Sequence, residues 1–251
     1  MTSYPRVFLW VAMFLVSWPP RIASAQEDVV EPIWTLSQAP GIVQEAFDLR
    51  ANYSLTEATV HYTIDGSAPS LDSPLWPGRY RAEATIMLRW IAVVDEVIVA
   101  RKGAGYLFAD AGVADFSSDL PIVVVDSFGV DIDSEGLADS RGPKRPVWSV
   151  FFERDPSSGR ASPRGTVDFS GRAGMRVRGQ SSTMFPKKQY TLELWDEENA
   201  DQSAGLLGFP KESDWILHAP FSDKTLMRNV LAYAWFREMG HYAVKTQYVE
   251  L

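Results

Sequence analysis

Residues 174–194 read GMRVRGQSSTMFPKKQYTLEL, and this stretch decides how the second half of the chain is expected to fold. Apolar and basic residues alternate up to Arg178, which is the two-residue period of a β-strand. Glycine and hydroxyl residues follow at 179–183, and a second strand-like run begins after Pro186. The pattern predicts two strands joined by a loop of small residues.

The same stretch is basic, although the chain as a whole carries a formal charge of −8. Five basic residues and no acidic one lie between Gly171 and Tyr190, namely Arg172, Arg176, Arg178, Lys187 and Lys188. Backbone amides and hydroxyls of such a loop can approach an anion, and the flanking cations supply charge. The sequence therefore predicts an anion site. The alternative is a solvated face whose cations are balanced by the carboxylates that follow at 193–198.

The N-terminus has the pattern of an export signal. Arg6 begins a positive region, residues 7–18 are apolar, and Ala23-Ser24-Ala25 resembles a cleavage site. We expect residues 1–25 to be removed and the product to be secreted, periplasmic or at the cell surface. The apolar run is too short to predict a stable membrane span after cleavage.

Composition narrows the classes of function. Loss of residues 1–25 removes two arginines and leaves 22 basic and 32 acidic residues, a formal charge of −10. That balance argues against nucleic acid as a partner, since such binding needs a dominant basic face. The chain has no cysteine, which excludes disulfides, thiolate metal sites and a cysteine nucleophile.

Residues 31–108 are expected to form a small antiparallel β-sandwich of the immunoglobulin-like kind, because short alternating runs are separated by turn residues. Runs at 58–64, 85–94 and 97–100 read as strands, with a tight turn at Asp65-Gly66. Residues 109–119 are small and acidic, as in a linker.

The order Val60-His-Tyr-Thr-Ile-Asp-Gly-Ser-Ala-Pro-Ser70, the run at 85–92 and a closing Gly-Tyr-Leu-Phe at 105–108 resemble the C-terminal domain of chitobiase and β-hexosaminidase. The resemblance implies an accessory domain without catalytic residues. Exposed Trp76 and Tyr80 would then contact a cell-surface carbohydrate. We favour the simpler interpretation that both aromatic side chains pack the sandwich.

Residues 120–251 are expected to form an α+β domain. Strands are predicted at 120–125, 147–152, 166–169 and 214–217, and another begins after His241. Ser222 or Asp223 is expected to cap a helix that runs to Met239 and stops at Gly240. Its apolar stripe would consist of Met227, Val230, Leu231 and Ala234.

No metal site is predicted, and the histidines are expected to be structural. The acidic stretches 131–136 and 197–203 superficially follow the pattern of calcium loops, but both lack the closing carboxylate. His61, His218 and His241 have no accompanying nucleophile motif such as Gly-x-Ser-x-Gly.

Four motifs, in this order, resemble the N-terminal part of the spore-coat CotH kinase family. They are Arg178-Gly-x-Ser-Ser182, Phe185-Pro-Lys-Lys188, Leu207-Gly208 with Ser213-Asp-Trp215, and Asp223-Lys-x-Leu-Met-Arg-Asn229. Gln180 replaces the Asn associated with that position. The resemblance implies an atypical protein-kinase-like fold that transfers the γ-phosphoryl group of ATP, with Mg, to hydroxyls of a protein substrate.

The resemblance also implies the residues of a nucleotide site, which are Arg178, Gly179, Ser181, Ser182, Lys187, Lys188, Arg228 and Asn229. The glycine and serine residues would cover the phosphates, and we prefer Lys187 over Lys188 as the phosphate cation, because its face of the strand is polar. The catalytic residues are unknown. No Asp stands in an Asp-x-x-x-x-Asn or Asp-Phe-Gly setting, so we expect an N-terminal portion that binds ATP without turnover. The alternative is a non-catalytic, glycan-associated surface or adhesion protein.

Overall fold

The computed structural model describes residues 33–132 and 142–251 in full, and the backbone of residues 10–15. The first part contains β2 Trp34–Leu36, β3 Gly41–Val43, β4 Phe47–Leu49, β5 Ala51–Tyr53, β6 Thr59–Thr63, β7 Tyr80–Ala82, β8 Ile86–Val94 and β9 Val97–Phe108. The second contains α1 Ala111–Ala114, β10 Ile122–Asp126, β11 Arg145–Phe152, β12 Val167–Arg178, the 3₁₀ turn η1 Ser181–Met184, β13 Gln189–Leu194, β14 Asp214–His218, α2 Arg228–Glu238 and β15 Thr246–Glu250. Strand β1 is Trp10–Leu15.

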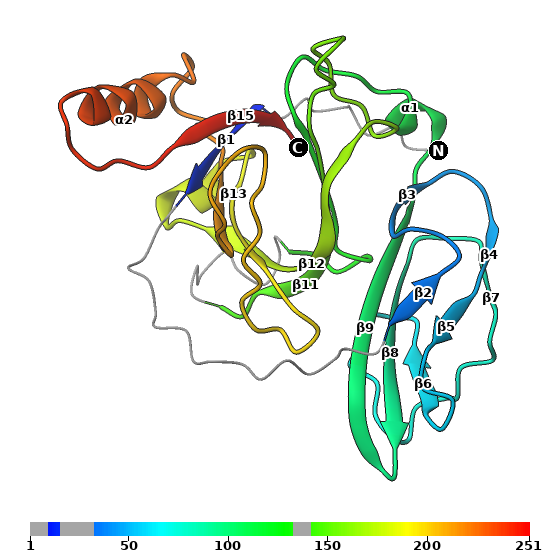
Figure 1. Ribbon diagram of the computed structural model, residues 1–251. Coiled ribbons are helices and arrows are strands. Elements are labelled where there is room, and N and C mark those ends of the chain that lie inside the picture. The colour runs from blue at the N-terminus through cyan, green and yellow to red at the C-terminus, as the bar shows by residue number, and fades with distance from the viewer. Residues whose placement is uncertain (1–9, 16–32, 133–141) are drawn as a thin grey trace.

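The first part is a sandwich-like arrangement in which the sheet β3-β9-β8-β6 faces the strand pairs β2–β5 and β4–β7 (Figure 1). The predicted strands at 58–64, 85–94 and 97–100 correspond to β6, β8 and the start of β9. Asp95 and Glu96 join β8 to β9 with φ angles of 49° and 64°, as a two-residue hairpin turn requires. A β-rich first part with mainly antiparallel sheets is therefore confirmed, although β3 and β9 pair in parallel.

Aromatic side chains fill the core of this first part. The Trp76 ring lies edge-on to Trp90, 5.4 Å away, and its indole N–H donates to the carbonyl of Ala51 at 3.2 Å. Tyr80 packs against the same buried cluster. Both side chains therefore have the packing role, and their rings are not displayed as an exposed platform.

The second part is a closed barrel with the strand order β1-β14-β13-β12-β11-β10-β15. All neighbours are antiparallel except β10 and β15, which are parallel. Alternate residues point inward and bury Phe151, Leu192, Trp215 and Leu217 completely. A β-rich domain is confirmed, whereas the kinase-like α+β organisation stays a proposal.

The sheet of the first part packs on the outside of the barrel. Met87 and Leu107 share a buried cluster with Ile122, Trp148 and Phe152 of β10 and β11. Because this core crosses residues 109–119, the division into two folding units at that point remains a proposal. The predicted linker contains the short helix α1.

Strand β1 lies within the predicted export signal. Its backbone pairs with β14 on one side and β15 on the other, and it closes the barrel. In this conformation residues 10–15 are part of the barrel. Cleavage of the predicted signal would remove them, so residues 10–15 cannot close the barrel in a protein from which the signal has been removed. No helix among the described residues is long and apolar enough to cross a membrane.

The prediction for helix α2 is wrong in two respects. The helix begins at Arg228, five residues beyond Asp223, although a carboxylate oxygen of Asp223 still accepts the N–H of Arg228 at 3.0 Å. No residue of α2 is buried, so the predicted apolar stripe packs against no core, and Trp235 and Phe236 are exposed. Figure 1 shows α2 projecting away from the barrel.

Candidate functional site

The loop of small residues joins neighbouring antiparallel strands, as expected. Strands β12 and β13 pair as far as Arg178 and Gln189, and residues 179–188 connect them. Gly179 has a φ of +106°, and a Cβ atom there would lie 2.0 Å from Ser182 Oγ. Only glycine takes this conformation without strain, so Gly179 sets the path of the loop.

Hydrogen bonds at one end of the loop leave amides available at the other. Thr183 Oγ1 donates to the carbonyl of Gln180 at 2.6 Å, and the Lys188 ammonium donates to the carbonyl of Thr183. Across the described residues, the backbone amides of Ser181 and Ser182 have no acceptor. They are the loop groups that could bind an anion.

The five basic residues do not form one patch. Arg172 is 3% exposed and donates to the carbonyl of Asp196 and to Asn199 Oδ1, and Glu197 lies 3.8 Å from its guanidinium. Burial lowers the pKa of Arg172, and the nearby carboxylates oppose that shift. Arg172 is therefore a structural cation, and counting it with the anion site was wrong.

Arg176 and Arg178 share one face of β12 but have different surroundings. The Arg176 guanidinium donates to the carbonyl of Gly142 at 2.8 Å. Arg178 is exposed and makes no ion pair with any described residue. Of the three arginines, Arg178 is the one that a ligand at the loop could reach.

Two of the predicted motifs meet at the loop. The Phe185 ring stacks on the Phe221 ring with 5.1 Å between their centroids. The Lys224 ammonium lies over the same Phe221 ring, 4.0 Å from its centroid. Asp223 accepts hydrogen bonds from Thr225. The segment before α2 is thereby held beside residues 179–188.

His218 links this segment to the barrel. Its Nδ1 is 2.7 Å from Gln189 Oε1, and its Nε2 is 3.1 Å from Asn229 Nδ2. These partners fit a neutral ring that carries its proton on Nδ1. Burial lowers the pKa of His218, and the charges of Arg178 and Lys187 lower it further while Asp223 raises it.

Lys187 is the half-buried cation of the site. Burial lowers its pKa, and attraction to Glu250 acts in the opposite direction. Lys187 and Lys188 therefore differ in their surroundings, since the Lys188 ammonium is bound to a loop carbonyl. Arg228, 3.6 Å from the Asp223 carboxylate, lies at the same end of the barrel.

Two side chains of the acidic stretch at 197–203 accept hydrogen bonds from β12 and β9. Asn199 Oδ1 accepts from Arg172, and Glu197 accepts the backbone N–H of Gly103 at 2.6 Å. No group of three or more His, Asp or Glu side chains able to hold a metal occurs in 33–132 or 142–251. The other predicted look-alike, at 131–136, lies mostly outside the described residues.

The fold and the loop define a β-barrel protein with a small-residue hairpin loop beside a half-buried lysine and an exposed arginine. Residues 175–251 match the family model described as CotH kinase protein, so the resemblance to that family is confirmed for this segment. No curated protein and no solved structure matches the chain. The match does not reach residues 31–108, where the chitobiase-like resemblance stays a prediction.

Sequence reasoning missed Gln189 and His218. Both lie next to predicted site residues, but the sequence shows no motif for them, because each depends on a partner from a different strand or helix. The polar face of β13, on which Gln189 follows Lys187 by two residues, was the one available signal.

Proposed function

We propose that this protein binds the phosphates of ATP at the loop between β12 and β13, as a CotH-like kinase would. The observation that carries the proposal is the left-handed Gly179 followed by the available amides of Ser181 and Ser182, within the segment that matches the family. Backbone amides presented by such a turn attract phosphate oxygens.

Each further residue has a role in the proposal. Arg178 reaches the phosphates as a bidentate donor, and Lys187 supplies a second positive charge from a half-buried position. Lys188 supports the loop through the Thr183 carbonyl and does not bind phosphate itself. These roles bring charge neutralisation and positioning, the main needs of phosphoryl transfer.

Arg228 and Asn229 form the edge of the site. The amide N–H of Asn229 is directed at His218, which turns its carbonyl Oδ1 away from the ring. Asn229 therefore offers an acceptor, suited to a hydroxyl group of the nucleotide or of a protein substrate. Arg228 is shared with Asp223, so its contribution to phosphate binding is smaller.

Among residues 33–132 and 142–251, no group of three or more acidic or histidine side chains could hold a metal ion without the nucleotide, whereas Mg²⁺ usually binds through one or two carboxylates together with the phosphates. ATP and its phosphates fit, because donors and cations surround the loop. We therefore propose nucleotide binding for this chain and derive no transfer step. When bound, Mg²⁺ would neutralise β- and γ-phosphate charge in a kinase of this kind.

Titration of the purified protein with ATP, with and without Mg²⁺, tests the proposal by calorimetry. Arg178→Met and Lys187→Ala should each weaken ATP binding at least about tenfold, which is about 1.4 kcal/mol. Lys211→Ala, which removes an exposed lysine away from the loop, is the matched control. ATP binding that neither substitution changes would contradict the proposal.

The same titration with a heparin tetrasaccharide separates the glycan-associated alternative. A polyanionic glycan that binds while ATP does not would favour a surface or adhesion protein. We further propose that the chain is exported, on the basis of the signal pattern at residues 1–25, and the mass of the secreted product would identify the cleavage point.

A further inference from the structure

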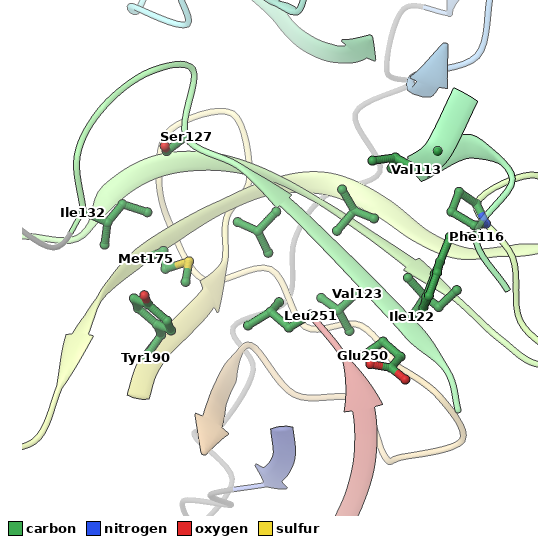
Figure 2. Close-up of a pocket in the computed structure, with 14 residues that line it drawn as sticks. Val113, Phe116, Ile122, Val123, Ser127, Ile132, Met175, Tyr190, Glu250 and Leu251 are labelled. Atoms are coloured by element: carbon green, nitrogen blue, oxygen red, sulfur yellow. The ribbon is translucent and has the colours of Figure 1, made fainter. Parts of the chain in front are cut away.

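A cavity of about 430 Å³ lies where the sheet of the first part packs against the barrel. Its lining comes from β8, β9 and residues 68–71 of the first part, and from residues 197–199 of the barrel. The cavity in Figure 2, between β10 and α1, differs in chemistry, because its described lining is mostly apolar and contains no basic residue. The β8–β9 cavity is lined by Arg89 and Arg101, and can therefore receive a negatively charged group.

Arg89 is a buried cation without an ion pair. The residue is 6% exposed and forms no salt bridge with any described carboxylate. Its guanidinium donates to the carbonyl of Glu197 and, at 3.4 Å, to the carbonyl of Gly66. A guanidinium has five N–H groups, so three of them have no acceptor among the described residues. A buried charge is costly unless an opposite charge is paired with it.

The two glutamates that line the cavity are paired with other arginines. Glu197 lies 3.8 Å from the Arg172 guanidinium, and Glu198 accepts a hydrogen bond from Arg101 at 2.9 Å. Burial, and next the charge of Arg172, lower the pKa of Arg89 to about 10, and the attraction of Glu197 opposes this shift without cancelling it. Arg89 therefore lacks an ionic partner of its own.

The rest of the lining limits the kind of anion. Glu197 and Glu198 repel a group with two negative charges. A carboxylate has a single charge, and its two oxygens match the planar fork of a guanidinium. Leu71 and Ile98 supply apolar surface in the same cavity. The volume lies in the range of small-molecule sites, about 300–1,000 Å³, so a molecule with one carboxylate and an apolar body matches this lining.

We propose that the β8–β9 cavity binds a small organic carboxylate. Its two oxygens accept N–H groups of Arg89, and its apolar body lies against Leu71 and Ile98. The ligand touches both the first part and the 197–199 turn, so its binding also stabilises the packing of the two parts. This inference is independent of nucleotide binding at the loop between β12 and β13.

Fluorine NMR of the whole protein with 4-fluorobenzoate as the probe tests the inference. The matched control is 4-fluorobenzamide, which has nearly the same shape and no charge. The carboxylate should bind with a dissociation constant of about 1 mM or below. The amide should bind at least about tenfold more weakly, because it cannot neutralise Arg89.

Substitutions locate the binding. Arg89→Met should weaken binding of 4-fluorobenzoate at least about tenfold. Leu71 and Leu75 are 46% and 61% exposed, but only Leu71 lines the cavity. Leu71→Asp should therefore weaken binding at least about tenfold, through repulsion and loss of apolar contact, whereas Leu75→Asp should leave it unchanged. This exposed pair keeps the test decisive if Arg89→Met does not fold.

Arg178→Met separates the cavity from the nucleotide site, since it removes the exposed cation of the loop and should leave 4-fluorobenzoate binding unchanged. The inference is overturned if the carboxylate and the amide bind equally, or if neither binds at about ten times the expected dissociation constant. Binding that Arg178→Met abolishes and Leu71→Asp does not change also overturns it. Inorganic phosphate bound at Arg89 to the exclusion of the carboxylate would make the cavity an inorganic-anion site instead.

Discussion

Replacement of Arg172 by methionine should destabilise the protein and leave ATP binding intact. Met preserves an apolar stem of similar length and removes the guanidinium. That group donates to the carbonyl of Asp196 and to Asn199 Oδ1, and lies 3.8 Å from Glu197. The substitution therefore leaves two part-buried acceptors without this donor and a carboxylate with less positive charge beside it.

The magnitude follows from burial. Removal of one partner of a buried ion pair costs about 3–5 kcal/mol. The Glu197 side chain is 27% exposed and also accepts a hydrogen bond from the N–H of Gly103, so the cost should lie at the lower end of that range. Arg172 also repels Arg89, whose pKa is lowered to about 10, mainly by burial and next by the charge of Arg172. The substitution removes this repulsion, which reduces the expected loss of stability. We expect a loss of about 3 kcal/mol, or about 6–12 °C in Tm for a chain of this size.

Urea unfolding and ATP calorimetry on the same preparations provide the measurement. Arg178→Met is the matched variant, since Arg178 lies on the same face of β12 and is exposed. It should change stability by less than about 1 kcal/mol and weaken ATP binding. The reasoning is refuted if Arg172→Met unfolds at the same urea concentration as the unsubstituted protein and loses ATP binding, because the basic residues would then act as one phosphate site.

Four other changes have defined outcomes. Gly179→Ala places a Cβ 2.0 Å from Ser182 Oγ at a φ of +106°, so ATP affinity should fall at least about tenfold in calorimetry, with a stability loss of only about 1–2 kcal/mol. His218→Gln should flatten the acid side of the stability curve: burial, Arg178 and Lys187 lower the pKa of His218, so the unsubstituted protein loses stability as pH falls from the ordinary value of 6.5 through the lowered pKa. Asp201→Asn should stabilise the protein at pH 7 and not near pH 3, because burial, Glu193 and Asp214 raise the pKa of Asp201. The stability due to the protonated carboxyl is lost as pH rises through that raised pKa. Equal urea midpoints of the variant and the unsubstituted protein at pH 7 would contradict this. Removal of residues 1–25 should speed amide exchange in β14 and β15 if β1 closes the barrel in solution, and unchanged exchange would show that residues 10–15 serve as a signal alone.

The strands were predictable from the sequence because their signals are local. Alternation identified the end of β12 and the whole of β13, and the runs at 85–94 and 97–100 identified β8 and the start of β9. The start of α2 was not predictable to the residue. Asp223 has the chemistry of a helix cap, but it first closes a turn with Thr225 and reaches the helix amide of Arg228 only after that turn.

The part of the site that was missed depends on distant contacts. His218 joins Gln189, 29 residues before it, to Asn229, 11 residues after it. The structural role of Arg172 was equally hidden. The 196–199 turn that binds Arg172 is held by Arg89, which donates to the carbonyl of Glu197 from 108 residues earlier in the chain. Charge counted along the sequence cannot separate a cation that folding buries from one that it leaves exposed.

The sheet of the first part determines which cations of β12 remain available. Arg172, Arg176 and Arg178 all occupy one face of that strand, because they are separated by even numbers of residues. Gly103 of β9 comes so close to Arg172 that a Cβ at that glycine would lie 3.0 Å from the Arg172 side chain. The arginine side chains are less buried toward the end of β12. Arg176 is half-buried and donates to the carbonyl of Gly142, and Arg178 is exposed beside the loop. A protein with an acidic total charge can in this way present a small, localised positive site, since the packed sheet buries Arg172, the 196–199 turn supplies its acceptors, and the carbonyl of Gly142 binds Arg176.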